Sequence, residues 1–414
     1  MLKVTDLVNW LEGKGGAIAA VLIIIVMISG IVYSLYLGNE MRFLPDEQDY
    51  YDLATNIAKS YSYSLDDINP TAYRPPGYPL FLSFPRFLGG GVIVLRILNF
   101  FILGFGIYLT YKILQREHSG IAGLIGVVLL IGYPVIFFTS GTLYPQILAS
   151  VLFLLIIYIY TGEPDKAWIY ALCGVLFGFL IITVPTFIFT LLLFPVWLGR
   201  KEKQSVGYLI MIGFALIILG LWGMRNYIQF NKIIYVSTNS GENLLLGNSE
   251  NTTPNGGRTI DISKYSRVAA SLDEVERDQY YRSAAFEYMR KNTSRSIQIY
   301  LLKVLNYFNF RNDLVTRSEG SQLRDILVLI TYGFLLSAFI LRIFLYKMFK
   351  ITNFERNLIV LYITSALFMA IFFTRIRFRI PYDFLLILIV ALFIAKLVYR
   401  YLLKSEPKVM VTSG

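Results

Sequence analysis

Histidine and cysteine are scarce in this sequence, and their shortage excludes several kinds of site. Among 414 residues there is one cysteine, Cys173, and one histidine, His118. A single cysteine excludes an internal disulfide, and the two residues cannot build a zinc site from histidine and cysteine ligands. A Ser-His-Asp triad and its Cys-His relative are excluded too, unless His118 lies on the catalytic side of the molecule.

Charge is also scarce, which excludes an ordinary soluble domain. Only 16% of the residues are charged and 56% are hydrophobic, with a mean hydropathy of +0.58. Apolar runs long enough to span a bilayer recur along the chain, so the sequence predicts a polytopic membrane protein. The net charge of +11 is explained by Lys and Arg in cytoplasmic loops. No basic domain with interleaved aromatic residues stands apart, so nucleic acid is excluded as a partner.

Hydropathy predicts an all-α fold of about ten membrane helices with a small mixed loop region outside the membrane. Each predicted span is near the ~20 residues that a bilayer requires. The predicted spans are 16–37, 91–111, 120–138, 143–161, 168–183, 185–199, 206–225, 323–345, 355–374 and 381–402. The first is too long for the apolar part of a signal peptide and lacks a clean cleavage site, so we expect it to be retained.

The distribution of Lys and Arg predicts that both termini are cytoplasmic. Two polar segments then face outward, the loop 38–90 and the region 226–322. We therefore expect three parts: a membrane module over 1–225, an extracytoplasmic region over 226–322, and C-terminal helices with a cytoplasmic tail over 323–414. Within the outer region, 267–291 reads as helix, and the β-branched residues of 233–246 are compatible with a short hairpin.

Two adjacent acids follow the first span. Asp46 and Glu47 come directly after Pro45 and are followed by Tyr50 and Tyr51. Solvated loop acids are common, but carboxylates this close to a bilayer are costly unless they have a function. The pattern predicts a short helix on the membrane surface that begins at Pro45.

Several arginines lie on the outer side, against the charge bias. In Tyr73-Arg74-Pro75-Pro76-Gly77-Tyr78, the prolines hold Arg74 in an extended segment, and both tyrosines suit a membrane interface. The others are Arg225, Arg375, Arg377 and Arg379. For Arg375, contact with lipid headgroups explains the position as well as a contact with substrate does. Because arginine gives bidentate recognition of phosphate, we favour a substrate contact for Arg74, Arg377 and Arg379.

Taken in order, these motifs resemble the GT-C superfamily of polyprenyl-phosphate-sugar-dependent glycosyltransferases, of the protein O-mannosyltransferase or aminoarabinose transferase type (families 39 and 83). The resemblance covers nearly the whole chain. It is carried by Leu44-Pro45-Asp46-Glu47, Tyr73-Arg74-Pro75-Pro76, Leu221 to Tyr227, Val236 to Leu244 with Gly247-Asn248, and Arg377-Phe378-Arg379-Ile380-Pro381.

The resemblance implies roles for individual residues. Asp46 matches the catalytic acid that acts as general base, and Glu47 matches its neighbour, which supports acceptor binding. Arg74 matches a basic position near the donor phosphate. The other substrate-binding residues implied by these segments are Tyr73, Tyr78, Gln146, Arg225, Asn226, Asn243, Arg377 and Arg379.

Two positions depart from the family pattern. Gln146 stands where the family often has Glu, and Val184 stands where it often has Arg. One acid and one base are therefore replaced together, either as a lost compensating pair or because donor contacts differ. The identity of the sugar does not carry over.

The expected activity is transfer of a sugar from an undecaprenyl- or dolichyl-type phosphate to a hydroxyl of a protein, lipid or glycan, with inversion, at the outer face of a bacterial inner membrane. No metal is required because arginines can carry the charge, although a divalent cation between Asp46 and Glu47 is compatible with the scheme. One alternative is a transporter or flippase for a lipid-linked or anionic substrate, and another is a polysaccharide polymerase or ligase.

Overall fold

The computed structural model describes residues 4–41, 45–162, 166–194, 202–311 and 322–403. The described residues form helices and loops and contain no β-strand, only an isolated bridge between Ser64 and Pro70. This confirms the predicted all-α class. The end of the predicted sixth span, 195–199, and the tail after 403 lie outside the described residues.

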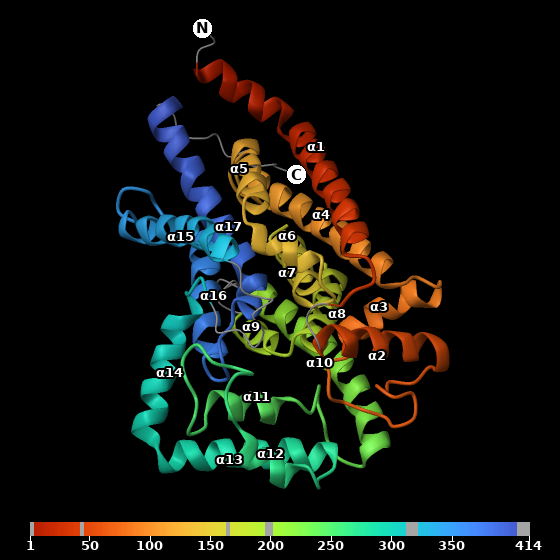
Figure 1. Ribbon diagram of the computed structural model, residues 1–414. Helices are drawn as coiled ribbons and strands as arrows, with labels where there is room; N and C mark the ends of the chain where they lie inside the picture. Colours follow the sequence, from red (N-terminus) through yellow and green to blue (C-terminus); the bar gives the residue numbers. More distant parts are fainter. Residues whose placement is uncertain (1–3, 42–44, 163–165, 195–201, 312–321, 404–414) are drawn as a thin grey trace.

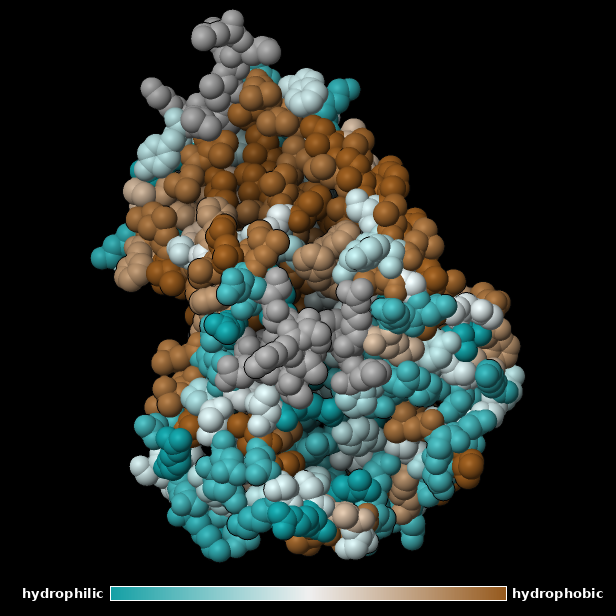
Figure 2. Space-filling model, viewed as in Figure 1, coloured by the Kyte–Doolittle hydropathy of each residue, from teal (hydrophilic) through white to brown (hydrophobic). Residues whose placement is uncertain are grey.

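Long apolar helices make up one part of the molecule, because their side chains are hydrophobic on nearly every face. They occupy the upper and middle parts of Figure 1, and the upper part is brown in Figure 2. The helices of this part are α1 (Val4–Leu37), α4 (Val92–Glu117), α5 (Gly120–Ile131), α6 (Pro134–Ser140), α7 (Gln146–Tyr160), α8 (Ala167–Thr183), α9 (Phe187–Leu193), α10 (Glu202–Phe230), α15 (Gln322–Phe344), α16 (Asn353–Met369) and α17 (Ile376–Val398), the last continued by a π-helical turn over Tyr399–Leu403.

Five of these helices are long and apolar enough to cross a membrane, which makes this an integral membrane protein. They are α1, α4, α10, α15 and α17 with its π-helical turn. Helices α5 and α6 meet at a 65° bend and could form a broken sixth span. Although each predicted span contains a helix, α7 and α8 have only 15 and 17 residues. The count of ten spans therefore stays a prediction.

Shorter polar helices make up a second part, which we call the polar layer. It consists of α11 (Ser240–Gly247), α12 (Ser263–Ala269) and α13 (Glu274–Lys291) with the loops between them, and α14 (Thr293–Tyr307) leads back to the apolar part. Figure 1 places it at the end of the molecule opposite the start of α1 and the end of α17, and Figure 2 shows it as hydrophilic. Helices α2 (Asp46–Ser60) and α3 (Gly77–Phe87) run across the direction of α1 where the two parts meet.

The helix predicted over 267–291 is divided, and the possible hairpin over 233–246 is wrong. Asp273 accepts hydrogen bonds from the Val275 and Glu276 amides and so begins α13 as a new helix. No described segment pairs with the β-branched stretch as a strand. It makes one backbone bond, from Thr238 to Ala72 (2.9 Å), before α11 begins.

Candidate active site

The first turn of α2 places three carboxylates at the boundary between the two parts. The helix begins at Asp46 after Pro45, as the sequence predicts. Acids in a first turn are stabilised by the positive end of the helix dipole. Tyr50 packs edge to face on Tyr78 of α3, with ring centroids 5.3 Å apart, and this contact holds α2 against α3. The Asp46 carboxylate therefore sits on a packed helix, not on a solvated loop.

Arg74 meets these carboxylates from the extended segment before α3. Its Nη2 lies 2.6 Å from Asp46 Oδ1, and Nε and Nη2 lie 2.9 and 2.6 Å from Asp49 Oδ2. Gly77, which follows this segment, packs so closely on α8 that a Cβ there would lie 2.2 Å from Thr183 Oγ1. Tyr63 also donates a hydrogen bond to the Arg74 carbonyl (2.8 Å). The proline-stiffened segment thus holds Arg74 at Asp46.

Arg377 approaches Asp46 from the opposite side. It belongs to the first turn of α17, and its Nη1 lies 2.6 Å from Asp46 Oδ2. A third guanidinium, that of Arg258 in the polar layer, has Nη2 3.8 Å from Asp46 Oδ1. Burial opposes ionisation of Asp46, but Arg377, Arg74 and Arg258 outweigh it, so the pKa of Asp46 is held well below its usual range. Asp46 is ionised in this arrangement.

Sequence reasoning missed two residues of this cluster, Arg258 and Asp49. Arg258 follows Gly257, which has φ +127° and whose missing side chain leaves room for Arg375 Nε, 2.8 Å from where a Cβ would be. An isolated arginine in a glycine-rich loop has no spacing that points to Asp46. Asp49 was also missed, although its place in the first turn of a predicted helix was a usable signal.

The cluster lines a cavity of about 180 Å³, which we call the acceptor-side cavity. Its walls combine the acid and arginines with hydroxyl and amide side chains from α7 and the polar layer. Its polar lining includes Asp46, Tyr73, Arg74, Tyr144, Gln146, Ser237, Asn239, Ser240, Asn243, Arg258 and Arg377. Gln146 Oε1 is buried and has no hydrogen-bond partner within the described part of the chain. Val184 lines the same cavity, so the two departures from the family pattern share one site.

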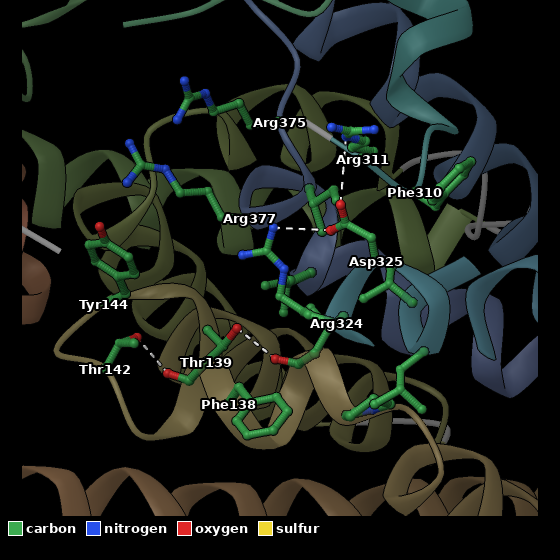
Figure 3. A pocket seen from close by; sticks show the side chains of 16 residues that line it. Phe138, Thr139, Thr142, Tyr144, Phe310, Arg311, Arg324, Asp325, Arg375 and Arg377 are labelled. Atoms are coloured by element: carbon green, nitrogen blue, oxygen red, sulfur yellow. Dashed lines mark hydrogen bonds and ion pairs between the residues drawn. The ribbon is translucent and has the colours of Figure 1, made fainter. Parts of the chain in front are cut away.

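A second cavity, of about 220 Å³, adjoins the first, and we call it the lateral cavity. It lies between α6, α15 and the start of α17. Its apolar walls come from residues such as Phe138, Leu327 and Ile380. Arg377 and Tyr144 line both cavities. In Figure 3 the Arg377 guanidinium lies beside the Tyr144 ring, 5.1 Å from its centroid, and Arg375 extends alongside.

The structure brings some of the sequence-predicted residues to these cavities and leaves others elsewhere. Asp46, Tyr73, Arg74, Gln146, Asn243 and Arg377 line the acceptor-side cavity. Glu47, Tyr78, Arg225, Asn226 and Arg379 line neither cavity. These five residues are bound to protein groups instead.

Glu47 supports the site from behind. Its side chain is fully buried, and Oε1 accepts a hydrogen bond from the Leu143 amide (2.8 Å) and lies 3.9 Å from Arg96 Nη2. It therefore fixes the segment that carries Tyr144 and Gln146. The divalent cation between Asp46 and Glu47 stays a prediction.

Arg225 and Asn226, near the end of α10, fasten this helix to the loop that carries Arg74 and to the segment before α11. Arg225 donates to the carbonyls of Thr71 (2.8 Å) and Tyr63 (3.1 Å). Asn226 donates to the Ile234 carbonyl (3.0 Å). These contacts position the site without reaching its cavities.

Arg379 and Tyr78 belong to the packed interior. Arg379 is fully buried and pairs with Asp383 (2.9 Å), and its Nη1 donates to the carbonyls of Tyr307 and Asn309. The spacing of four between Arg379 and Asp383 was a signal for this pair in the sequence. Tyr78 is buried beside Asn99.

Fold and site together define an integral membrane protein with a buried acid bound by arginines at the boundary between its apolar and polar parts. Comparison with solved structures finds ArnT from Cupriavidus metallidurans bound to undecaprenyl phosphate, with 12% identity and a TM-score of 0.41, covering 90% of this chain and 76% of that one. The apo state of the same protein matches with 13% identity and a TM-score of 0.40, covering 92% and 76%. No protein-family model and no curated protein matches this chain. Because the similarity to these structures is low, the function is argued from the residues of the site.

Proposed function

We propose that this protein is a membrane glycosyltransferase that moves a sugar from a polyprenyl-phosphate donor to a hydroxyl acceptor at the extracytoplasmic face. The observation that carries the proposal is the Asp46 carboxylate, which is ionised, 6% exposed and bound by Arg74 and Arg377 in a cavity next to a lateral, apolar one. The acid suits proton removal from a hydroxyl, and the arginines suit a phosphate leaving group.

In the proposed reaction the acceptor hydroxyl gives its proton to Asp46 while its oxygen bonds to the anomeric carbon. The bond from that carbon to the phosphate oxygen breaks, and its electron pair leaves with the polyprenyl phosphate. Attack from the opposite face inverts the anomeric centre in one displacement. No second carboxylate is needed as a nucleophile, in contrast to retaining glycosidases.

The arginines would stabilise the charge that grows on the leaving phosphate. Arg74 and Arg377 are fixed on either side of Asp46, and Arg258 lies 3.8 Å from it. Arg74 and Arg377 were expected from the sequence and Arg258 was not. Arg225 and Arg379, which were also expected to contact substrate, line neither cavity. With three cations at the site, the scheme requires no metal.

Polar side chains on the other wall would bind the acceptor. Asn239, Ser240 and Asn243 come from the start of α11 and face the same cavity as Asp46. The polar layer would therefore select the acceptor, whether protein, lipid or glycan.

Acceptor-dependent release of free polyprenyl phosphate tests this function against the transporter reading. We expect the purified protein in lipid nanodiscs to release polyprenyl phosphate from a sugar-loaded donor only when a hydroxyl acceptor is present. A flippase would move the intact donor across vesicles without cleaving it. Intact donor after long incubation with a panel of envelope acceptors, together with donor movement across vesicles, would contradict the proposal.

Replacing Arg74 should impair use of the donor more than use of the acceptor. Arg74→Gln removes a cation that lies 2.6 Å from Asp46, and a charge-assisted contact is worth about 1.5–3 kcal/mol. We expect KM for the donor to rise by about ten- to a hundredfold, with a smaller change in KM for the acceptor. Steady-state kinetics with each substrate varied in turn gives both values.

The matched variant Arg74→Lys keeps the charge but loses the two-pronged geometry that now engages Asp46 and Asp49. Its KM for the donor should lie between those of the wild type and Arg74→Gln. If Arg74→Gln changed the KM for the donor and the KM for the acceptor equally, Arg74 would not be a contact of the donor phosphate.

A further inference from the structure

Arg377 lies between the two cavities, so its guanidinium can contact groups in either one. It lines the acceptor-side cavity, where Nη1 is bonded to Asp46, and it also lines the lateral cavity. Its buried Nε has no hydrogen-bond partner within the residues that the structure describes. The guanidinium thus has donor capacity that its bond to Asp46 does not use.

The bond to Asp46 occupies the carboxylate that the reaction needs. Arg74 Nη2 lies 2.6 Å from Oδ1 and Arg377 Nη1 lies 2.6 Å from Oδ2, so both oxygens already accept a short charged hydrogen bond. The Asp46 side chain is only 8% exposed. An acceptor hydroxyl meets a carboxylate whose two oxygens are both occupied and whose basicity the arginines suppress.

Of the two arginines, Arg377 is the one with fewer ties. Arg74 is also bonded to Asp49 through Nε and Nη2, and its guanidinium lies over the Tyr73 ring at 4.9 Å. The side chain of Arg377 is 25% exposed against 8% for Arg74. Among the described residues, its one ion pair is with Asp46, and its guanidinium also lies 5.1 Å from the Tyr144 and Phe378 ring centroids. Moving Arg377 therefore breaks fewer contacts.

The lateral cavity has the chemistry of a lipid phosphate site. Its apolar wall includes Leu327 of α15, a helix that exposes Ile326, Ile330 and Phe334 on its outer surface. The cations among its described lining residues include Arg311, Arg324, Arg375 and Arg377. Asp325 is the one acid among those residues, and it pairs with Arg324 at 3.1 Å and with Arg311 at 3.6 Å. Figure 3 shows Arg375 and Arg377 reaching in the same direction, away from Asp325.

We propose that Arg377 is a donor-operated switch: the phosphate of the lipid donor in the lateral cavity draws Arg377 off Asp46, which frees the carboxylate for the acceptor. Donor binding must then precede productive acceptor binding, and Asp46 becomes an effective base only when a sugar is present to transfer. The inference rests on the function proposed above and adds the regulation of that site.

The test measures binding of farnesyl phosphate. Farnesol, which has the lipid chain alone, and inorganic phosphate, which has the phosphate alone, are the comparison probes. Binding is measured by calorimetry on the full chain in nanodiscs, after a thermal melt confirms that each variant is folded. Because Asp46→Asn releases Arg377, it should bind farnesyl phosphate about tenfold tighter than the wild type, although it cannot act as a base. The gain should vanish in the Asp46→Asn, Arg377→Met double variant.

Glu242→Gln is the matched control for charge. The Glu242 carboxylate accepts a hydrogen bond from the Tyr73 hydroxyl (3.0 Å) behind the same cavity, and no ion pair between it and Arg377 occurs among the described residues. It should change the affinity by less than about twofold, since among the described residues Glu242 holds no bond to Arg377 that its loss would release. A gain in Asp46→Asn that persists without Arg377, or that Glu242→Gln reproduces, would overturn the switch.

A different outcome would count against the proposed function itself. If the wild type and every variant bound farnesyl phosphate no better than farnesol, the lipid phosphate donor would be wrong. If they bound it no better than inorganic phosphate, the lateral cavity would not hold the lipid chain, and the switch would fail while transfer remained open to the release assay.

Discussion

Asp46→Asn should abolish sugar transfer while leaving the protein folded. The carboxylate is the acid that the described part of the chain places between Arg74 and Arg377 in the acceptor-side cavity, and asparagine cannot accept the proton. Loss of a positioned general base lowers a rate by about 10²- to 10⁴-fold. The measurement is the initial rate of acceptor-dependent polyprenyl phosphate release, normalised to folded protein from size-exclusion chromatography.

Asp52→Asn is the matched control, because it makes the same chemical change on the same helix. Asp52 is bonded to Gln48 (2.8 Å) and lines neither cavity. It should transfer at close to the wild-type rate. Transfer by Asp46→Asn at a rate similar to that of Asp52→Asn would mean that another group removes the proton.

Glu355→Ala should destabilise the protein more than any exposed charge replacement. Glu355 lies in the first turn of α16 and is fully buried, with Oε2 2.9 Å from Arg342 Nη2 of α15 and 2.7 Å from Lys396 Nζ of α17. Its loss would leave Arg342, which is also fully buried, without its carboxylate. Removing one partner of a buried ion pair costs about 3–5 kcal/mol in free energy of unfolding. Thermal or denaturant unfolding in detergent measures the loss.

Glu287→Ala provides the comparison, since Glu287 and Lys291 form an exposed pair on α13. Such a pair contributes about 0.3–0.5 kcal/mol. Glu355 lines neither cavity, so the transfer rate per folded molecule should be unchanged. If Glu355→Ala and Glu287→Ala lowered the melting temperature equally, the ion pairs of Glu355 that join α15, α16 and α17 would contribute no net stability.

The helices were predictable wherever the signal is local. Apolar runs gave a helix within each of the ten expected spans, and Pro45 with the acids after it gave the start of α2. Asp46 and Arg74 were also expected to act at one site. These features depend on neighbouring residues, whose spacing the sequence displays directly.

Roles of adjacent residues were not predictable, because they depend on which way each side chain points. Successive residues of a helix point about 100° apart. Asp46 therefore faces the arginines, and Glu47 faces the Leu143 amide and Arg96. Arg377 and Arg379, two positions apart on α17, point to nearly opposite sides, one to Asp46 and the other to Asp383.

By itself, then, the sequence determined a polytopic all-helical membrane protein with an acid and an arginine in the loop after its first long helix, since hydropathy and local spacing contain that information. Only the tertiary structure decided that Arg258, from a distant loop, joins Asp46 and that Arg377 lines two cavities at once. Both facts depend on how α17 and the polar layer pack against α2. Contacts between segments so far apart in the chain leave no periodic trace in the residues that make them.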